Sequence, residues 1–198
     1  MCETFLTLPK NTYHNKAVGF SFTKPAEWHF LSFNEMLKEK GTALIEESKE
    51  DAAKRKQYIK SLYASTSMEP VAIARFKEPY KGLNPQFQVF LHSGYDEYKD
   101  SALSLLNQYL RYYLQQVAGF RVIVPPTIFM VSGREATYSR FYLTYTTNEG
   151  ENIKAKSMIF LIPKEDKFFL LTITSSIEDW PSLAGDFKKI INSIDVKY

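Results

Sequence analysis

Four β-rich segments follow one another in the C-terminal half of this chain, and they constrain its fold more than any other feature. Each one either alternates apolar with polar residues or is rich in β-branched and aromatic types. Short connections such as Ser132-Gly133 and Asn148-Glu149-Gly150 separate them, and connections of this kind join antiparallel neighbours. The sequence therefore predicts an antiparallel β-meander and disfavours parallel βαβ topology. The four segments are residues 127–131, 136–147, 154–162 and 168–175.

An earlier pair of strands and two helices accompany the meander. Residues 71–76 and 86–92 have strand composition and are joined by a loop, which predicts a hairpin. Apolar residues recur at helical spacing over residues 103–117, and Gly119 follows as a natural helix terminator. A closing helix begins near Pro181 and has one apolar face that should cover the meander. The predicted fold class is α+β, an antiparallel β-sheet sandwiched by helices.

The N-terminal third is less regular. Residues 1–17 show no periodic pattern and are interpreted as an N-terminal arm, so a single domain is predicted over residues 18–198. A helix is expected over residues 34–45, and the charged run at 46–60 is interpreted as a solvated helical face because acidic residues precede basic ones.

Net charge and cysteine content limit the possible partners and cell compartments. A net charge of +3 and a pI near 8.7 describe a mixed surface, so no nucleic-acid partner is expected. Cys2 is the only cysteine, which excludes an internal disulfide. A cysteine next to the starting Met is what an export signal ending at a lipobox would leave after its removal, so Cys2 is a candidate lipidation site. In that case the location is the cell envelope; otherwise Cys2 is incidental and the location is cytoplasmic.

The chain carries no recognisable catalytic or metal-binding signature. Its eight glycines are scattered and form no phosphate-binding loop, and no serine has the setting of a nucleophile elbow. His14, His29 and His92 are too dispersed for a local metal site. The charges of Arg134, Glu135 and Arg140 are expected to form cross-strand pairs on a solvent face. We therefore predict no cofactor, no metal and no enzymatic activity.

One candidate binding cleft can be named from the sequence. His92 ends a predicted strand and precedes a polar loop that contains Tyr95 and Asp96, while Tyr109 and Tyr112 form a stripe beside the main apolar face of the 101–118 helix. These side chains could line a cleft for a small molecule. The alternative interpretation is a histidine satisfied within a turn and tyrosines that extend the core.

Both ends of the chain carry a resemblance to a known family. The segment Gly19-Phe20-Ser21-Phe22-Thr23-Lys24-Pro25-Ala26-Glu27-Trp28 resembles the strand and Pro-x-x-Trp start of the PsbP-like family. The closing helix, with Phe187 and Ile190-Ile191-Asn192-Ser193-Ile194, is similar to that family's end. The resemblance spans residues 18–196 and implies a PsbP-like α/β/α sandwich.

The same resemblance implies a non-enzymatic accessory or binding module. Relatives include an extrinsic photosystem II subunit, a factor that binds a nuclear-import GTPase, and bacterial exported lipoproteins, but no ligand or partner motif transfers residue by residue. We therefore expect a bacterial protein-binding or assembly module of unknown partner, with a possible membrane tether through Cys2. The alternatives are a small-molecule-binding domain that uses the cleft beside the 101–118 helix, and an enzyme assembled from dispersed residues.

Overall fold

The computed structural model describes residues 10–31, 35, 68–78, 80–93, 101–111, 117–146 and 150–197. The helices expected at 34–45 and 46–60 lie outside these ranges, apart from Glu35. The elements in chain order are β1 (Thr12–Asn15), β2 (Phe20–Thr23), β3 (His29–Phe30), β4 (Met68–Arg75), β5 (Gln86–Ser93), α3 (Ala102–Tyr109), β6 (Arg121–Val131), β7 (Arg134–Thr146), β8 (Asn152–Lys164), β9 (Lys167–Ser176), α4 (Trp180–Asn192) and β10 (Asp195–Val196).

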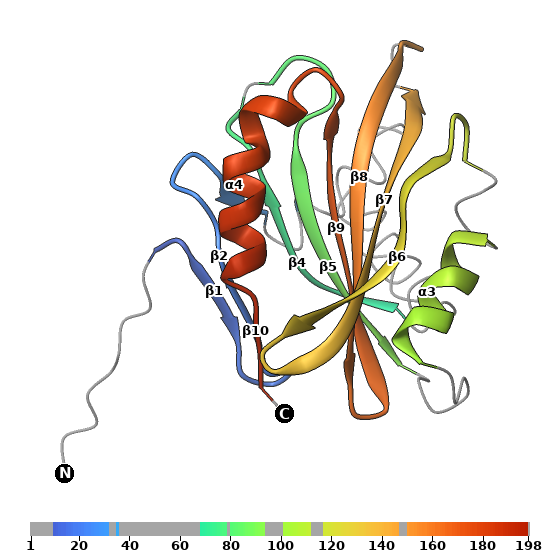
Figure 1. Ribbon diagram of the computed structural model, residues 1–198. Coiled ribbons are helices and arrows are strands. Elements are labelled where there is room, and N and C mark those ends of the chain that lie inside the picture. Colours follow the sequence, from blue (N-terminus) through green and yellow to red (C-terminus); the bar gives the residue numbers. More distant parts are fainter. Residues whose placement is uncertain are drawn as a thin grey trace, which may run out of the picture.

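The strands form two sheets. A seven-stranded sheet has the order β3-β4-β5-β9-β8-β7-β6, and a small sheet has the order β1-β2-β10. Every pairing between the described strands is antiparallel, and the strands from β6 to β9 follow the chain as a meander (Figure 1). The predicted α+β class with an antiparallel meander is therefore confirmed.

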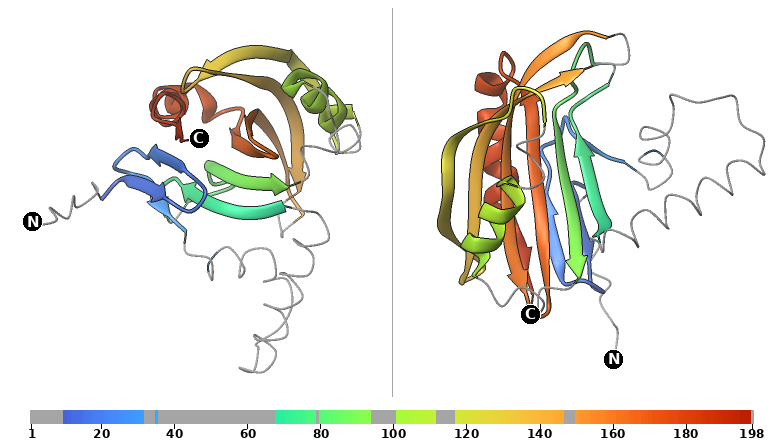
Figure 2. Two further views of the ribbon diagram at one scale, coloured as in Figure 1. Left: turned by 90° about the horizontal axis from the view of Figure 1, so that it is seen from below. Right: turned by 90° about the vertical axis from the view of Figure 1, so that its right-hand side faces the viewer.

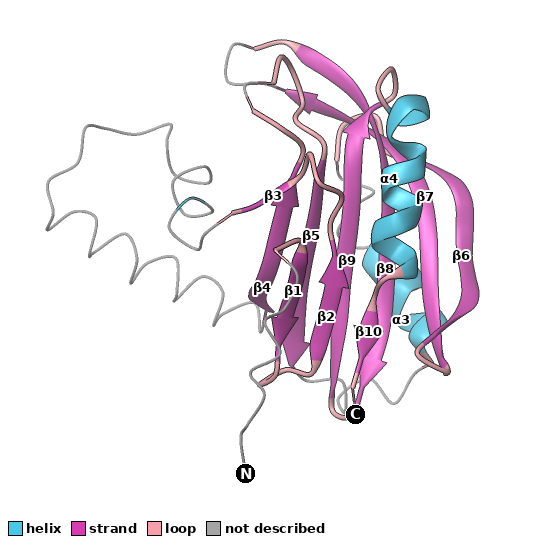
Figure 3. Ribbon diagram, turned by 90° about the vertical axis from the view of Figure 1, so that its left-hand side faces the viewer, coloured by secondary structure: helices cyan, strands magenta, loops and turns pink. Residues whose placement is uncertain are grey.

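The large sheet is strongly curved, and both of its faces are covered. Seen from below, α3 lies outside the curve, while α4 and the small sheet lie on the other side (Figure 2). Figure 3 shows the small sheet and α4 lying against the same side of the large sheet. Successive residues of β7 and β8 point to opposite faces of the sheet, and both strands place apolar residues on each face. Both faces must therefore be covered, which gives the α/β/α arrangement.

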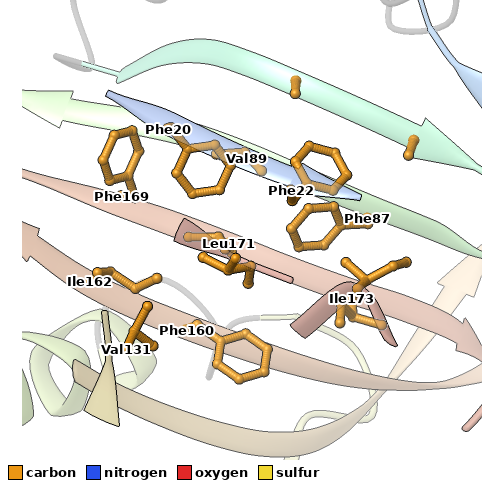
Figure 4. Packing of buried hydrophobic residues seen from close by; sticks show 14 of the residues in the cluster. Phe20, Phe22, Phe87, Val89, Val131, Phe160, Ile162, Phe169, Leu171 and Ile173 are labelled. Atoms are coloured by element: carbon orange, nitrogen blue, oxygen red, sulfur yellow. The ribbon is translucent and has the colours of Figure 1, made fainter. Parts of the chain in front are cut away.

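The larger core lies between the big sheet, the small sheet and α4. Phe20 and Phe22 project from β2 and meet Phe87 and Phe169 from the large sheet, with ring centroids 4.7 Å apart for Phe22 and Phe87 and 4.8 Å apart for Phe20 and Phe169 (Figure 4). Aromatic side chains bury large areas, so this stack is a major source of the fold's stability. A second core under α3 contains Leu106 and its neighbours from β7, β8 and β9.

Residues 10–17, the described part of the predicted N-terminal arm, take part in this fold. Tyr13 of β1 donates a hydrogen bond to the carbonyl of Val71 at 2.6 Å, and its ring packs 5.7 Å from Phe22. The domain boundary predicted at Val18 therefore falls inside the β1–β2 hairpin, because residues 12–15 pair with residues 20–23.

Two element boundaries differ from the sequence prediction. Strand β6 begins at Arg121 and not at Thr127. It continues through Pro125 and Pro126, which lie where the β6–β7 register shifts. Prolines are tolerated there because β6 is an edge strand and irregular pairing needs fewer N–H donors. Helix α3 is described from Ala102 to Tyr109, and residues 112–116 of the predicted helix lie outside the described ranges.

Candidate functional site

Strand β6 forms one edge of the seven-stranded sheet and pairs only with β7 among the described strands. An edge strand leaves backbone N–H and C=O groups on its outer side available to another chain. Proteins protect such edges with charged residues, prolines or bulges, and β6 has the last two at its centre, where Pro125 and Pro126 interrupt the regular register. The stretches on either side of the prolines are therefore the ones that can pair.

Those two stretches are apolar and exposed. Among the described residues, five large hydrophobic side chains are classed as exposed, and four of these belong to β6. Met130 is 63% exposed and Ile128 is 48% exposed, while Val122 and Ile123 are about two-fifths exposed. Isolated apolar residues are common on protein surfaces, but four on one edge strand, two on either side of the prolines, make this edge a candidate interaction surface.

The register shows which face these side chains share. Val122 pairs with Phe141 and Ile128 pairs with Thr137, and directly paired residues on neighbouring strands point to the same face. Phe141 belongs to the core under α3, and the Thr137 hydroxyl donates to the carbonyl of Ala102 in that helix at 3.1 Å. The apolar side chains of Val122 and Ile128 therefore lie on the α3 side of the sheet.

An open groove of about 830 Å³ runs between α3 and the start of β6. Its second wall is apolar and consists of Phe120, just before β6, and Val122, Pro125 and Pro126 of β6. Its helix wall is largely polar, and the residues that contribute are Ser101, Ser104, Asn107, Gln108 and Arg111, with the apolar Leu103 and Leu110 between them. A groove with one apolar and one polar wall can take an amphipathic segment.

Local sequence positions the helix wall. Ser101 is the N-cap of α3, and its hydroxyl accepts a hydrogen bond from the backbone N–H of Ser104 at 3.3 Å. Asn107 donates its amide to the carbonyl of Leu103 at 2.8 Å, which turns this side chain back onto its own helix. Leu105 and Leu106 on the opposite side of α3 are buried and hold the helix on the sheet.

Of the predicted cleft residues, the structure describes His92 and Tyr109, and neither lines this groove. His92 stacks on Phe168 with ring centroids 4.6 Å apart, and its Nδ1 lies 2.8 Å from the carbonyl of Ser93. Tyr109 is half-buried and packs against the core under α3. Cys2, Tyr95, Asp96 and Tyr112 lie outside the described residues. A groove therefore lies beside α3, but its lining includes neither His92 nor Tyr109.

The cleft predicted from the sequence did not include β6, which forms the second wall of the groove beside α3. The signal was present as a proline pair inside a β-rich run, because such a pair in a strand indicates an edge. Elsewhere in the described ranges, no group of three or more His, Cys, Asp and Glu side chains could hold a metal ion. No helix in the same ranges has both the length and the apolar character that crossing a membrane requires.

The fold of this chain has counterparts among solved structures. No protein-family model and no curated protein sequence matches the chain. The solution structure of cyanobacterial PsbP (CyanoP) from Synechocystis sp. PCC 6803 is similar to it with a TM-score of 0.58 and 12% identity, over 94% of this chain and 91% of CyanoP. The fold is therefore PsbP-like, as the resemblance at both ends of the chain implied.

A second solved structure shares the same fold. LpqN, which is involved in cell envelope biogenesis of Mycobacterium tuberculosis, matches with a TM-score of 0.53 and 14% identity. The match covers 90% of this chain and 83% of LpqN.

Proposed function

We propose that the chain is a single-domain, non-enzymatic protein-binding module that receives an extended segment of a partner protein along β6. The observation that carries this proposal is the concentration of exposed apolar side chains on one edge strand. Four of the five exposed large hydrophobic residues in the described ranges belong to β6. The PsbP-like fold supports it, because the family resemblance implies accessory and binding roles.

The physical basis is strand addition. A peptide that pairs with an exposed sheet edge gains main-chain hydrogen bonds, and pockets for its alternate side chains provide specificity. On β6, the apolar side chains of Val122 and Ile128 and the groove beside α3 lie on the same side of the sheet. A bound segment can therefore pair with the edge while its apolar residues pack against these side chains.

Peptide selection tests this proposal. Extended peptides selected from a display library against the wild-type protein are expected to alternate apolar and polar residues. The double substitution Ile128→Ser and Met130→Ser should weaken their binding at least ~10-fold, since losing two central apolar contacts costs more than about 1.4 kcal/mol. Ile177→Ser is the matched control, because Ile177 is also exposed but lies outside β6. Equal binding by all three proteins would refute the proposal.

A small molecule in the groove is the second candidate function. The groove's volume of about 830 Å³ is within the usual range of ligand pockets, and its two walls differ in polarity. A thermal-shift screen tests it, because a ligand that binds the folded state raises the melting temperature. A stabilising compound whose effect disappears in Val122→Ser would support this function, whereas a screen without stabilising compounds would reject it.

We also propose that Cys2 tethers the natural protein to the cell envelope through a lipid. The position of Cys2 next to Met1 and the fold shared with LpqN support this. Intact mass and fractionation of the full-length natural gene product test it. A diacylated, membrane-bound product that becomes unmodified in Cys2→Ser is the expected result, and an unmodified cytosolic product would overturn it.

A further inference from the structure

A second surface lies on the opposite face of the same strands, and it combines cations with aromatic rings. Arg121 of β6 pairs with Tyr142 of β7, and Tyr142 pairs in turn with Lys156 of β8, so these three side chains form one row across three strands. Arg140 lies two residues from Tyr142 on β7 and therefore on the same face. We call Arg121, Arg140, Lys156 and their aromatic neighbours the basic-aromatic face.

Each cation of this face lies over its own aromatic ring. The Arg121 guanidinium carbon is 5.3 Å from the centroid of Tyr142, and that of Arg140 is 5.8 Å from Tyr138. Lys156 Nζ is 4.8 Å from the ring centroid of Trp180, at the first turn of α4. These distances are within the range of cation–π attraction, which holds the three cations in place without neutralising them.

Within the part of the chain that the structure describes, no carboxylate forms an ion pair with Arg121, Arg140 or Lys156. The cross-strand ion pair that the sequence predicted for Arg140 is absent, because its strand neighbours are Val124 and Met158. The Nε atom of Arg140 is buried and has no hydrogen-bond partner among the described residues. A buried N–H without an acceptor costs free energy, so the packing around Arg140 does not satisfy its guanidinium fully.

The electrostatics of Lys156 agree with an uncompensated site. Burial, and then the positive charge of Arg140, lower the pKa of Lys156. Two like charges close enough to interact disfavour each other's charged form. An anion bound between them would remove this repulsion, so the face has more to gain from an acidic ligand than an ordinary solvated lysine does.

We propose that the basic-aromatic face binds an acidic segment of a protein partner. Arg121 and Lys156 are two strand spacings apart, about 10 Å, which suits several carboxylates along a chain better than one compact anion. Arg140 can present its guanidinium to one carboxylate, while the rings of Tyr138, Tyr142 and Trp180 offer apolar contact to the segment's other side chains.

This inference rests on the proposed protein-binding function but uses the opposite face of strands β6, β7 and β8. The inference adds that the partner's segment is acidic, and it rests on other residues than the proposal for the β6 edge does. Substitution of Ile128 and Met130 should leave the acidic segment bound, so failure of one proposal does not imply failure of the other.

The two tryptophans provide a direct readout by NMR. Trp180 lies under Lys156 in the face, whereas Trp28 is buried in the core and serves as an internal control. The probe is a synthetic peptide of alternating Glu and Ser, with a Gln–Ser peptide of equal length as its neutral counterpart. We expect saturable shifts of the Trp180 indole and the Arg140 Nε–H signals with the acidic peptide only, while the Trp28 indole stays in place.

Substitutions test whether the shifts arise from this face. The double variant Arg140→Gln, Lys156→Gln should weaken peptide binding at least ~10-fold, because both charges contact the same segment. The variant Lys16→Gln, Lys188→Gln removes the same net charge from exposed positions elsewhere and should bind as the wild type does. Equal weakening in both variants, or inorganic phosphate binding as tightly as the peptide, would overturn the proposal.

Discussion

The indole N–H of Trp28 donates a hydrogen bond to Asp186 Oδ2 at 3.1 Å, which joins two residues 158 positions apart. Trp28 ends the Pro-x-x-Trp segment, and Asp186 belongs to the closing helix α4. The ring of Trp28 also meets that of Phe187 at 5.9 Å in a T-shaped arrangement. The two ends of the chain that carry the family resemblance are therefore in direct contact.

Asp186 contacts both Trp28 and Lys189, and the two contacts are predicted to contribute unequally to the free energy of unfolding. Asp186→Ala should lower the free energy of unfolding by about 1–3 kcal/mol, since it leaves the buried N–H of Trp28 without its charged acceptor. Lys189→Ala removes the exposed ion pair to the same carboxylate and should cost less than about 1 kcal/mol. Denaturant unfolding measures both values, and equal losses would contradict the role given to Trp28.

Gly19 is predicted to be indispensable where the small sheet meets the C-terminus. It has a φ of +64°, and a Cβ there would lie 2.5 Å from the carbonyl oxygen of Lys197. Gly150 has a φ of +82°, and a Cβ there would have no described atom within 4 Å. Gly150→Ala should therefore lower the free energy of unfolding by only about 1–2 kcal/mol, the strain of an alanine at positive φ. Gly19→Ala should lower it by clearly more, because a steric clash is added. Equal melting temperatures for the two variants would contradict this assignment.

Tyr80 should make stability depend on pH in the alkaline range. Burial, followed by the hydrogen bond to Asp179 and the charge of that carboxylate, raises the pKa of Tyr80 to about 12. The unfolded value is about 10, so the stabilisation is fully present below pH ~10 and is lost as the pH rises towards 12.

Comparison with Tyr80→Phe isolates this contribution, because burial also raises the pKa of Tyr145. The difference in unfolding free energy between wild type and variant should be constant near neutral pH and should shrink above pH ~10. A constant difference up to pH ~12 would show that the hydroxyl of Tyr80 titrates normally in the folded state.

Much of the fold could be predicted because its signals are local. The period-two pattern of β7 and β8 and the turn residues Ser132 and Gly133 specify antiparallel neighbours within a few positions of each residue. Ser132 and Gly133 both have positive φ, of 48° and 76°, as two-residue hairpin turns require. The closing helix was equally visible from Pro181 and its apolar face.

The candidate surfaces could not be predicted in the same way because they depend on strand order. The proline pair Pro125–Pro126 indicates an edge strand, but the position of β6 at the end of the sheet follows only from the complete strand order, and the type of residue at Met130 does not distinguish an exposed position from a core one. The neighbours of Arg140 are likewise set by cross-strand register. The ring contact of His92 with Phe168 is set in the same way, because it comes from the adjacent strand β9.

The most direct test of the account is site-specific photo-crosslinking of the full-length protein in its natural cells. A photoreactive residue in place of Met130, which is 63% exposed on β6, should crosslink to one discrete partner protein. Adding Ile128→Asp should abolish that product, and a photoreactive residue in place of the exposed Lys188 on α4 should not form it. The same product from Lys188, or a product from Met130 that Ile128→Asp leaves unchanged, would contradict the assignment of β6 as the binding edge.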